Sequence, residues 1–323
     1  MNERIAQLPW SDQQWDCINQ AVYEEAARTR VAAKFLRPTK AAPTDVAVPR
    51  YSLQPGLAPL VPAAAAPAVV QNRLLVNSMP DVPLTTLSML VYVRSHEAAD
   101  PELQAAQTMF RRAAALIARA EDALMFNGRA LGLPIFGAPP QVQVTGALPA
   151  TQDGLVRAAA AVFPAVPPPP LGVPFNVPRN NALVAGLVGA AGSVAAATGA
   201  ALVAELTTAI TLLKSAAYSP PYALVLANDL YEAINTPAAA SLTSVRPTIQ
   251  RLLEDGPLLH SDLITGGWGV LVSYDRMEVE QVVASDIGVR FLYVSEEPRF
   301  VFRVSVRTAL RVRDWEAIVN LNP

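Results

Sequence analysis

Hydrophobic and polar residues alternate without a break from Arg299 to Arg313, in the segment RFVFRVSVRTALRVR. A period of two residues predicts a β-strand with one buried face. An extended segment of this length spans roughly 50 Å, whereas a typical strand has about 5–6 residues. It therefore favours an elongated or shell-building domain, in which long strands carry contacts between subunits. One face holds Phe300, Phe302, Val304, Val306, Thr308, Leu310 and Val312, and the other holds Arg303, Ser305, Arg307, Ala309, Arg311 and Arg313.

Two other segments have the spacing of three and four residues that predicts amphipathic helices. Ser11 to Phe35 starts with a capping box, because Gln14 lies three residues after Ser11, and should end before Pro38. Asp100 to Gly128 has an N-cap residue at its start and a glycine stop at its end. The buried seam of this second, long helix is expected to contain Leu103, Ala106, Phe110, Ala113, Ile117, Ala120 and Leu124.

Proline interrupts the pattern between residues 38 and 83, where nine prolines exclude a central sheet strand. We expect two extended arms here, at Val46–Leu53 and Val69–Val76, followed by a strand at Leu84–Val93. Residues 138–198 have the composition of a Pro/Ala-rich insertion. Helices are expected at Leu202–Ser215, Asp229–Ile234 and Thr248–Glu254, and strands at Tyr222–Ala227, Gly269–Ser273 and Val282–Val294.

The composition narrows the classes of function. The net charge of -2 argues against a nucleic-acid binder, which would carry a basic surplus. The single cysteine, Cys17, excludes an internal disulfide and fits a reducing compartment, where it is expected to be a small buried residue. Only 16% of the residues are charged and 52% are hydrophobic, which favours burial of surface in subunit contacts.

Neither a secretory signal nor a membrane span is expected. The first residues, MNERIAQLPWSDQQW, hold no basic stretch followed by an apolar run. Ala182 to Ala204 is uncharged and long enough to cross a bilayer, but it consists mainly of alanine and glycine and lacks flanking anchors.

The segments SDQQW and AAKF, the long helix ending EDALMFNG, the block PPYALVLANDLYEAI and the terminal RDWEAIVNLN occur in an order that resembles the encapsulin shell proteins. This prokaryotic nanocompartment family, also called the linocin-type bacteriocin family, has the α+β fold of HK97-type phage capsids. The resemblance covers roughly residues 8–137 and 199–321. It implies an N-terminal interior-facing helix at 1–37, an E-loop at 38–83, a P-domain (spine helix and long-stranded sheet) at 84–137 and 276–323, and an A-domain at 138–275 that includes the insertion.

The resemblance also implies a function. The expected protein is a non-enzymatic, self-assembling icosahedral shell of sixty copies, or a multiple of sixty, located in the cytoplasm. It would enclose a cargo enzyme recruited by a short C-terminal targeting peptide, with no nucleic acid, membrane or cofactor as a partner. One alternative is a phage or prophage major capsid protein that packages DNA, and another is an Ala/Pro-rich membrane-associated enzyme.

Candidate chemistry is sparse. The two histidines are His96 and His260, and the run His260-Ser261-Asp262 is expected to be a surface turn, because triad members rarely adjoin in sequence. We expect no catalytic residue and no metal site.

Carried over by position, the resemblance implies that a groove for the cargo peptide is lined by Ile18 and Val22 on the first helix and by Ile287 and Val289 on a strand. The alternative is that these four residues only pack the helix onto the sheet. The pore loop implied at 236–244 contains Thr236, Ser241, Thr243 and Ser244. From the residues themselves, Arg303, Arg307 and Arg311 could form an electrostatic seam with a neighbouring subunit or a solvated strand face. Glu121-Asp122 near a helix C-terminus requires a cation, for which we expect arginines of the same strand.

Overall fold

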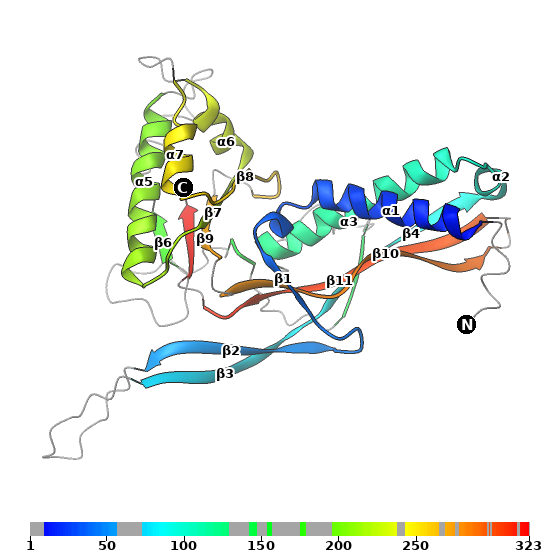
Figure 1. The fold of residues 1–323 in the computed structure, drawn as a ribbon, viewed down its shortest axis with the longest axis horizontal. Coiled ribbons are helices and arrows are strands. Elements are labelled where there is room, and N and C mark those ends of the chain that lie inside the picture. Colours follow the sequence, from blue (N-terminus) through cyan, green and yellow to red (C-terminus); the bar gives the residue numbers. More distant parts are fainter. Residues whose placement is uncertain are drawn as a thin grey trace, which may run out of the picture.

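Two β-sheets, each with its own helices, and one projecting hairpin make up the computed structural model of the chain (Figure 1). The structure describes residues 10–56, 73–128, 142–146, 154–156, 175–178, 196–237, 243–264, 269–274, 278–295, 297, 299–314 and 317–322. Its mixture of helices and sheets confirms the expected α+β class.

The first sheet is built around the predicted long strand. That strand, β11 (Arg299–Val312), has 14 residues and lies between two antiparallel partners. The register sets Arg303 opposite Arg290 on one side and opposite Leu90 on the other. The strand order is β1 (Arg37–Lys40), β10 (Val279–Val294), β11, β4 (Thr85–Arg94) and β5 (Gln143–Thr145), with β1 parallel to β10.

Helices α1 (Asp12–Thr29) and α3 (Gln104–Asn127) cover one face of this sheet, beside the short α2 (Ser95–Ala98) (Figure 1). Every residue of the predicted seam is buried, because that side of α3 meets the apolar face of β11. Phe302 lies at the centre, with its ring stacked on Trp10 at 4.9 Å and edge-on to Phe110 at 5.2 Å. The alternating strand and the helical seam thus form a single core.

Both long helices are shorter than predicted. The α1 helix ends at Thr29, and a 3-10 turn, η2 (Ala32–Lys34), follows, because the Asp122 carboxylate accepts hydrogen bonds from the backbone N–H groups of Val31 and Ala32. The α3 helix starts at Gln104 instead of Asp100. There the Asp100 carboxylate accepts from the backbone N–H groups of Glu102 and Gln104, and Leu103 takes a left-handed conformation (φ 51°) that breaks the helix.

The start of α1 gives a first testable prediction. The Ser11 hydroxyl accepts from the Gln14 backbone N–H, and the Gln14 side chain accepts from the Ser11 N–H, as the capping box requires. Ser11→Ala should lower the free energy of unfolding by about 1 kcal/mol, because one helix-end donor loses its acceptor. Ser11→Asp, which keeps an acceptor there, should change it little. Urea denaturation of the two variants measures the difference, and equal losses would contradict the capping role.

The second sheet lies at the other end of the molecule (Figure 1). Its order is β6 (Phe175–Pro178), β12 (Ile318–Asn322), β9 (Gly269–Ser273), β7 (Tyr222–Leu226) and β8 (Leu258–His260). Helices α5 (Ala196–Ser215), α6 (Asn228–Asn235) and α7 (Arg246–Leu252) pack with it. Strands β7 and β9 are buried at every residue, which explains why their sequences are continuously apolar.

Two short strands pair with the sheet that is formed mainly by the other predicted segment. β5 lies within the predicted insertion but pairs with β4 of the first sheet. β12 lies within the predicted P-domain segment but pairs with β9 and β6 of the second sheet. These two short strands therefore connect the ends of the molecule. Most of the insertion lies outside the described residues, and the boundaries as a whole stay a prediction.

The hairpin β2 (Ala47–Gly56) and β3 (Arg73–Pro83) confirms the two predicted arms, which pair antiparallel and extend away from both sheets (Figure 1). We call residues 47–56 and 73–83 the arm. The described part of the second strand runs from Arg73 to Pro83, past the predicted end at Val76, and residues 57–72, which include the predicted start at Val69, lie outside the described residues. Among the helices that the structure describes, none is long and apolar enough to cross a membrane; most of Ala182–Ala204 falls outside that part of the chain.

Candidate assembly and cargo surfaces

Apolar side chains are exposed in the described part of the arm and at its base. Val46, at its base, is 68% exposed, and Tyr51, on β2, is 49% exposed. An isolated two-stranded hairpin is at best marginally stable in water. A hairpin of this length that extends from the body therefore requires a second surface to lie on.

A second exposed apolar surface lies at the end of the first sheet where β10 turns into β11. Tyr92, Tyr293 and Val294 are all exposed there, and they line an open hollow of about 560 Å³. Ser295, Glu297 and Arg299 form the rest of its wall, and the Arg299 guanidinium pairs with the Glu297 carboxylate at 2.6 Å. Exposed aromatic side chains with a charged rim are typical of protein contact surfaces.

The four predicted groove residues come together in the core between α1, α3 and the first sheet. Ile18 and Val22 are fully buried and Ile287 is 8% exposed, while Val289 is half-buried at the edge of the same cluster. Trp15 of α1 and Phe291 of β10 are also only partly covered there. Ile18, Val22 and Ile287 therefore pack the helix against the sheet, whereas Val289 lies where this cluster meets solvent.

Two of the three members of the predicted arginine seam, Arg307 and Arg311, bind residues of their own chain, and the contact of the seam with a neighbouring subunit stays a prediction. Arg307 donates to the backbone carbonyls of Pro43 and Asp45. Arg311 forms an ion pair with Glu280 at 2.7 Å, and Arg313 pairs with the same carboxylate at 2.7 Å. Arg303 alone is exposed, with no hydrogen bond or ion pair to the described residues.

The cation that neutralises Glu121 is Arg30, at the end of α1, and not an arginine of β11. The Arg30 Nε donates to the Glu121 carboxylate at 2.7 Å, and its Nη2 donates to Asp286 at 3.0 Å. Glu121 also accepts from the Gln281 amide at 2.5 Å. This network joins α1, α3 and β10, so the end of the N-terminal helix is tied to the sheet by charge as well as by apolar packing.

Burial raises the pKa of the Glu121 carboxyl from 4.5 to about 7, although the Arg30 guanidinium opposes the change. Burial likewise raises the pKa of Asp122 from 3.8 to about 6, against two backbone hydrogen bonds that favour the carboxylate. A carboxyl whose pKa is higher in the folded chain stabilises the fold most below its unfolded pKa. For Glu121 this contribution is lost as the pH rises from about 4.5 to about 7.

Glu121→Gln should remove that pH dependence. Between pH 5 and pH 7 the free energy of unfolding of the wild type should fall by on the order of 2 kcal/mol more than that of the variant, since each pKa unit corresponds to about 1.4 kcal/mol. Urea denaturation at several pH values measures the shift. Glu102→Gln, at an exposed position, is the control, and a Glu121 variant that runs parallel to wild type over this range would contradict the assignment.

The pore-loop residues are only partly within the described chain. Thr236 follows the end of α6 and is exposed, Thr243 is exposed and Ser244 is half-buried. Ser241 lies outside the described residues. The pore itself stays a prediction.

The histidine and cysteine contacts are structural. His260 stacks on Tyr231 at 4.5 Å, while Asp262 pairs with Arg119, so the neighbouring His-Ser-Asp residues do not form a triad. Cys17 is exposed and its sulfur accepts from Gln107 at 3.3 Å, so the expectation of a buried cysteine is wrong. No cluster of three His, Cys, Asp or Glu side chains suited to a metal occurs in the described ranges.

The family model described as encapsulating protein for peroxidase (Linocin_M18) matches residues 179–304 of the chain. No curated protein matches it. Among solved structures, the virus-like particle from Pyrococcus furiosus is 14% identical, with 95% of this chain and 98% of that chain covered and a TM-score of 0.61.

This chain has the fold that encapsulins share with phage capsid proteins. The SrpI encapsulin of Synechococcus elongatus, 13% identical, covers 91% of this chain and 88% of its own at a TM-score of 0.53. The capsid of the Myoviridae phage XM1, 14% identical, covers 88% of each chain at a TM-score of 0.54. The resemblance to encapsulins and the HK97-type α+β fold expected from the sequence are thus confirmed. The assignment of the hairpin to the E-loop and of α3 to the spine helix stays a prediction.

Two ionic clusters of this encapsulin-like chain were missed by sequence reasoning: Arg30 with Glu121, and Glu280 with Arg311. A signal for the first was present, because Glu121 and Asp122 interrupt an apolar seam and no basic residue follows them on the same helix. That signal indicates a distant cation, but it does not identify which one.

Proposed function

We propose that copies of this chain assemble into a closed icosahedral shell, an encapsulin-type compartment that encloses a cargo enzyme in the cytoplasm. One observation carries the proposal: a capsid-type body projects an arm on which Tyr51 is exposed, with Val46 exposed at its base, and the described residues of the chain leave both uncovered. A neighbouring copy supplies such a surface, and many copies with heterologous contacts close when the rotation between neighbours closes.

The cargo is proposed to be a redox enzyme, since the matching family model is described by its encapsulation of a peroxidase. Its targeting peptide would dock where α1 meets β10. Trp15, Val289 and Phe291 offer partly exposed apolar surface there, over a floor that includes Ile18 and Val22. An extended peptide that places alternate side chains in such pockets is a common mode of recognition.

A DNA-packaging capsid has the same fold and is the second candidate function. Packing DNA favours a basic inner surface, and the slightly acidic net charge of this chain argues against it. The charge therefore supports a protein cargo.

The test measures the mass and the contents of purified particles. Light scattering should give about 2.1 MDa, which is sixty copies of the 34.3 kDa chain, or a multiple of that mass. After protease and nuclease treatment, the particles should retain a second protein and no nucleic acid. Protected DNA would favour the capsid alternative, and a monomer would contradict both.

A further inference from the structure

The arm joins the body through a short root, residues 41–50, which includes the first four residues of β2. Backbone hydrogen bonds join Ala41 to Val283 at 3.0 Å and Leu84 to Val46 at 3.0 Å. A small apolar cluster lies beneath the root and comprises Val48, Val82, Leu84, Val282, Ala284 and Ala309. Several of these side chains are small, so apolar packing alone fixes the direction of the arm weakly.

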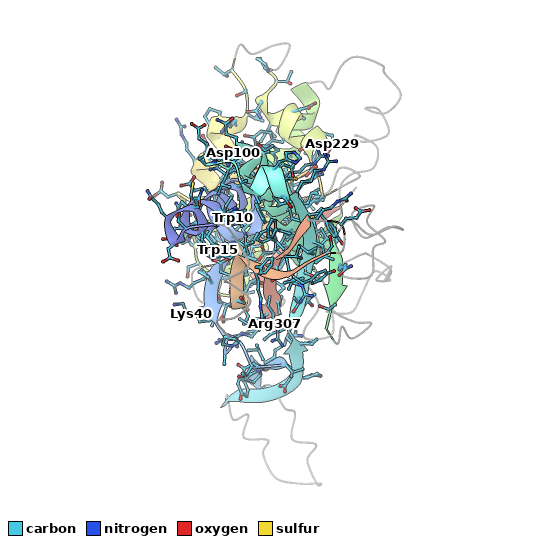
Figure 2. All side chains as sticks on the ribbon, turned by 90° about the vertical axis from the view of Figure 1, so that its right-hand side faces the viewer. Trp10, Trp15, Lys40, Asp100, Asp229 and Arg307 are labelled. Carbon is cyan, nitrogen blue, oxygen red and sulfur yellow. The ribbon has the colours of Figure 1, made fainter. Side chains whose placement is uncertain are left out.

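Two arginines of β11 bind the backbone of this root. The Nη1 of Arg307 donates to the Pro43 carbonyl at 2.7 Å, and its Nη2 donates to the Asp45 carbonyl. Arg311 Nη1 donates to the Pro49 carbonyl at 3.3 Å, while its Nη2 is held by the buried Glu280 carboxylate. Figure 2 shows Arg307 and Lys40 at the border of the body from which the arm extends.

The chemistry of Arg307 suits it to this position. A guanidinium is planar and presents several donors in a fixed fork, so it can bind two carbonyls at once and hold them at a set angle. The ammonium of lysine is a point charge on a flexible stem and cannot hold that angle. Since both acceptors are backbone carbonyls of the turn that follows Ala42, the contact fixes the path of the chain and not a neighbouring side chain.

The length of the arm magnifies any change at its root. The 11 residues of β3 span about 36 Å at about 3.3 Å per residue, so a tilt of about 10° at the root moves the far end by about 6 Å. That displacement exceeds the spacing of about 4.8 Å between paired strands. An arm that tilts this far no longer meets a neighbouring copy in a single register.

We propose that Arg307, supported by Arg311, sets the angle at which the arm leaves the body, and through that angle the curvature at which shell subunits meet. This inference rests on the proposed shell function. Arg307 acts as a positioning residue within its own chain, which is a different role from the contact with another subunit expected of it from the sequence.

The test compares Arg307→Ala and Arg307→Lys with Arg303→Ala. Arg303 lies four residues away on the same face of β11 and contacts no described residue through a hydrogen bond or ion pair, so it is the matched control for loss of a positive charge. Circular dichroism and the midpoint of urea denaturation report folding, and electron microscopy reports the distribution of particle diameters.

Both Arg307 variants should fold and yield open or unevenly sized particles, with shells of wild-type diameter a minority, while Arg303→Ala gives wild-type shells. Arg307→Lys keeps the charge and the aliphatic stem. If Arg307→Ala fails to fold, the particle diameters of Arg307→Lys test the inference. Uniform shells of wild-type diameter from a folded Arg307 variant, or a defect confined to Arg303→Ala, would overturn the inference and leave the shell function intact. Absence of shells from the wild-type chain would overturn both.

Discussion

Shortening the arm to a two-residue turn should abolish shell formation and leave the body folded. Arg50 and Met79 are directly paired across β2 and β3, so an Asn-Gly turn can join them in place of residues 51–78. The contacts of Arg307 and Arg311 with the root, and the small cluster that includes Val48 and Val82, are all retained. Only the part of the arm that reaches beyond the body is lost.

Light scattering should give the mass of one chain or of a small oligomer for this shortened protein, against megadaltons for wild type. The circular dichroism spectrum should retain the helical signal of α1, α3 and α5, because the core clusters that bury these helices include no described residue of the removed segment. Tyr51→Ser, which keeps the full length of the arm, is the milder control and should weaken assembly without abolishing it. Closed shells formed by the shortened chain would exclude the arm as the essential contact.

Removing the charge of Arg30 is expected to have the largest effect on the stability of the body. Its guanidinium is the cation bound to Glu121, whose side chain is only 2% exposed, and it also binds Asp286. Arg30→Ala should lower the free energy of unfolding by about 3–5 kcal/mol, because removal of one partner leaves a buried charge uncompensated. Urea denaturation at pH 8, above the raised pKa of Glu121, measures the effect where the carboxylate is ionised.

Two further variants separate charge from packing. Arg28→Ala removes an exposed arginine from the same helix turn and should have little effect, since its pair with Glu25 lies at the surface. Glu121→Gln in the Arg30→Ala background should recover part of the loss, because no charge is then left buried. A loss for Arg30→Ala as small as that for Arg28→Ala would show that the network contributes little.

The sequence predicted the helices and strands whose hydrophobic pattern lies within the element itself. Alternation from Phe300 to Val312 specified both the long strand and its buried face, and the seam from Leu103 to Leu124 specified the side of α3 that packs on it. The prolines between 38 and 83 correctly placed a projecting hairpin instead of a central strand. In each case the residues that define the element also make its main contacts.

Polar contacts between distant segments could not be predicted in this way. Asp122 ends α1 by accepting from Val31 and Ala32, which no pattern within residues 11–35 indicates. For Arg307 the alternation left open a contact with a neighbouring subunit or a solvated face of β11, and it did not indicate the root of the arm that this side chain binds. The groove residues show a related limit, because an aliphatic stripe predicts burial equally well beneath a ligand or within a core.

Negative-stain electron microscopy of the purified chain tests the central claim most directly. The account predicts closed particles of uniform diameter, from which the number of subunits follows. Monomers or small oligomers under several conditions of salt and pH would contradict it, since a capsid-type body with an uncovered arm would then have some other role.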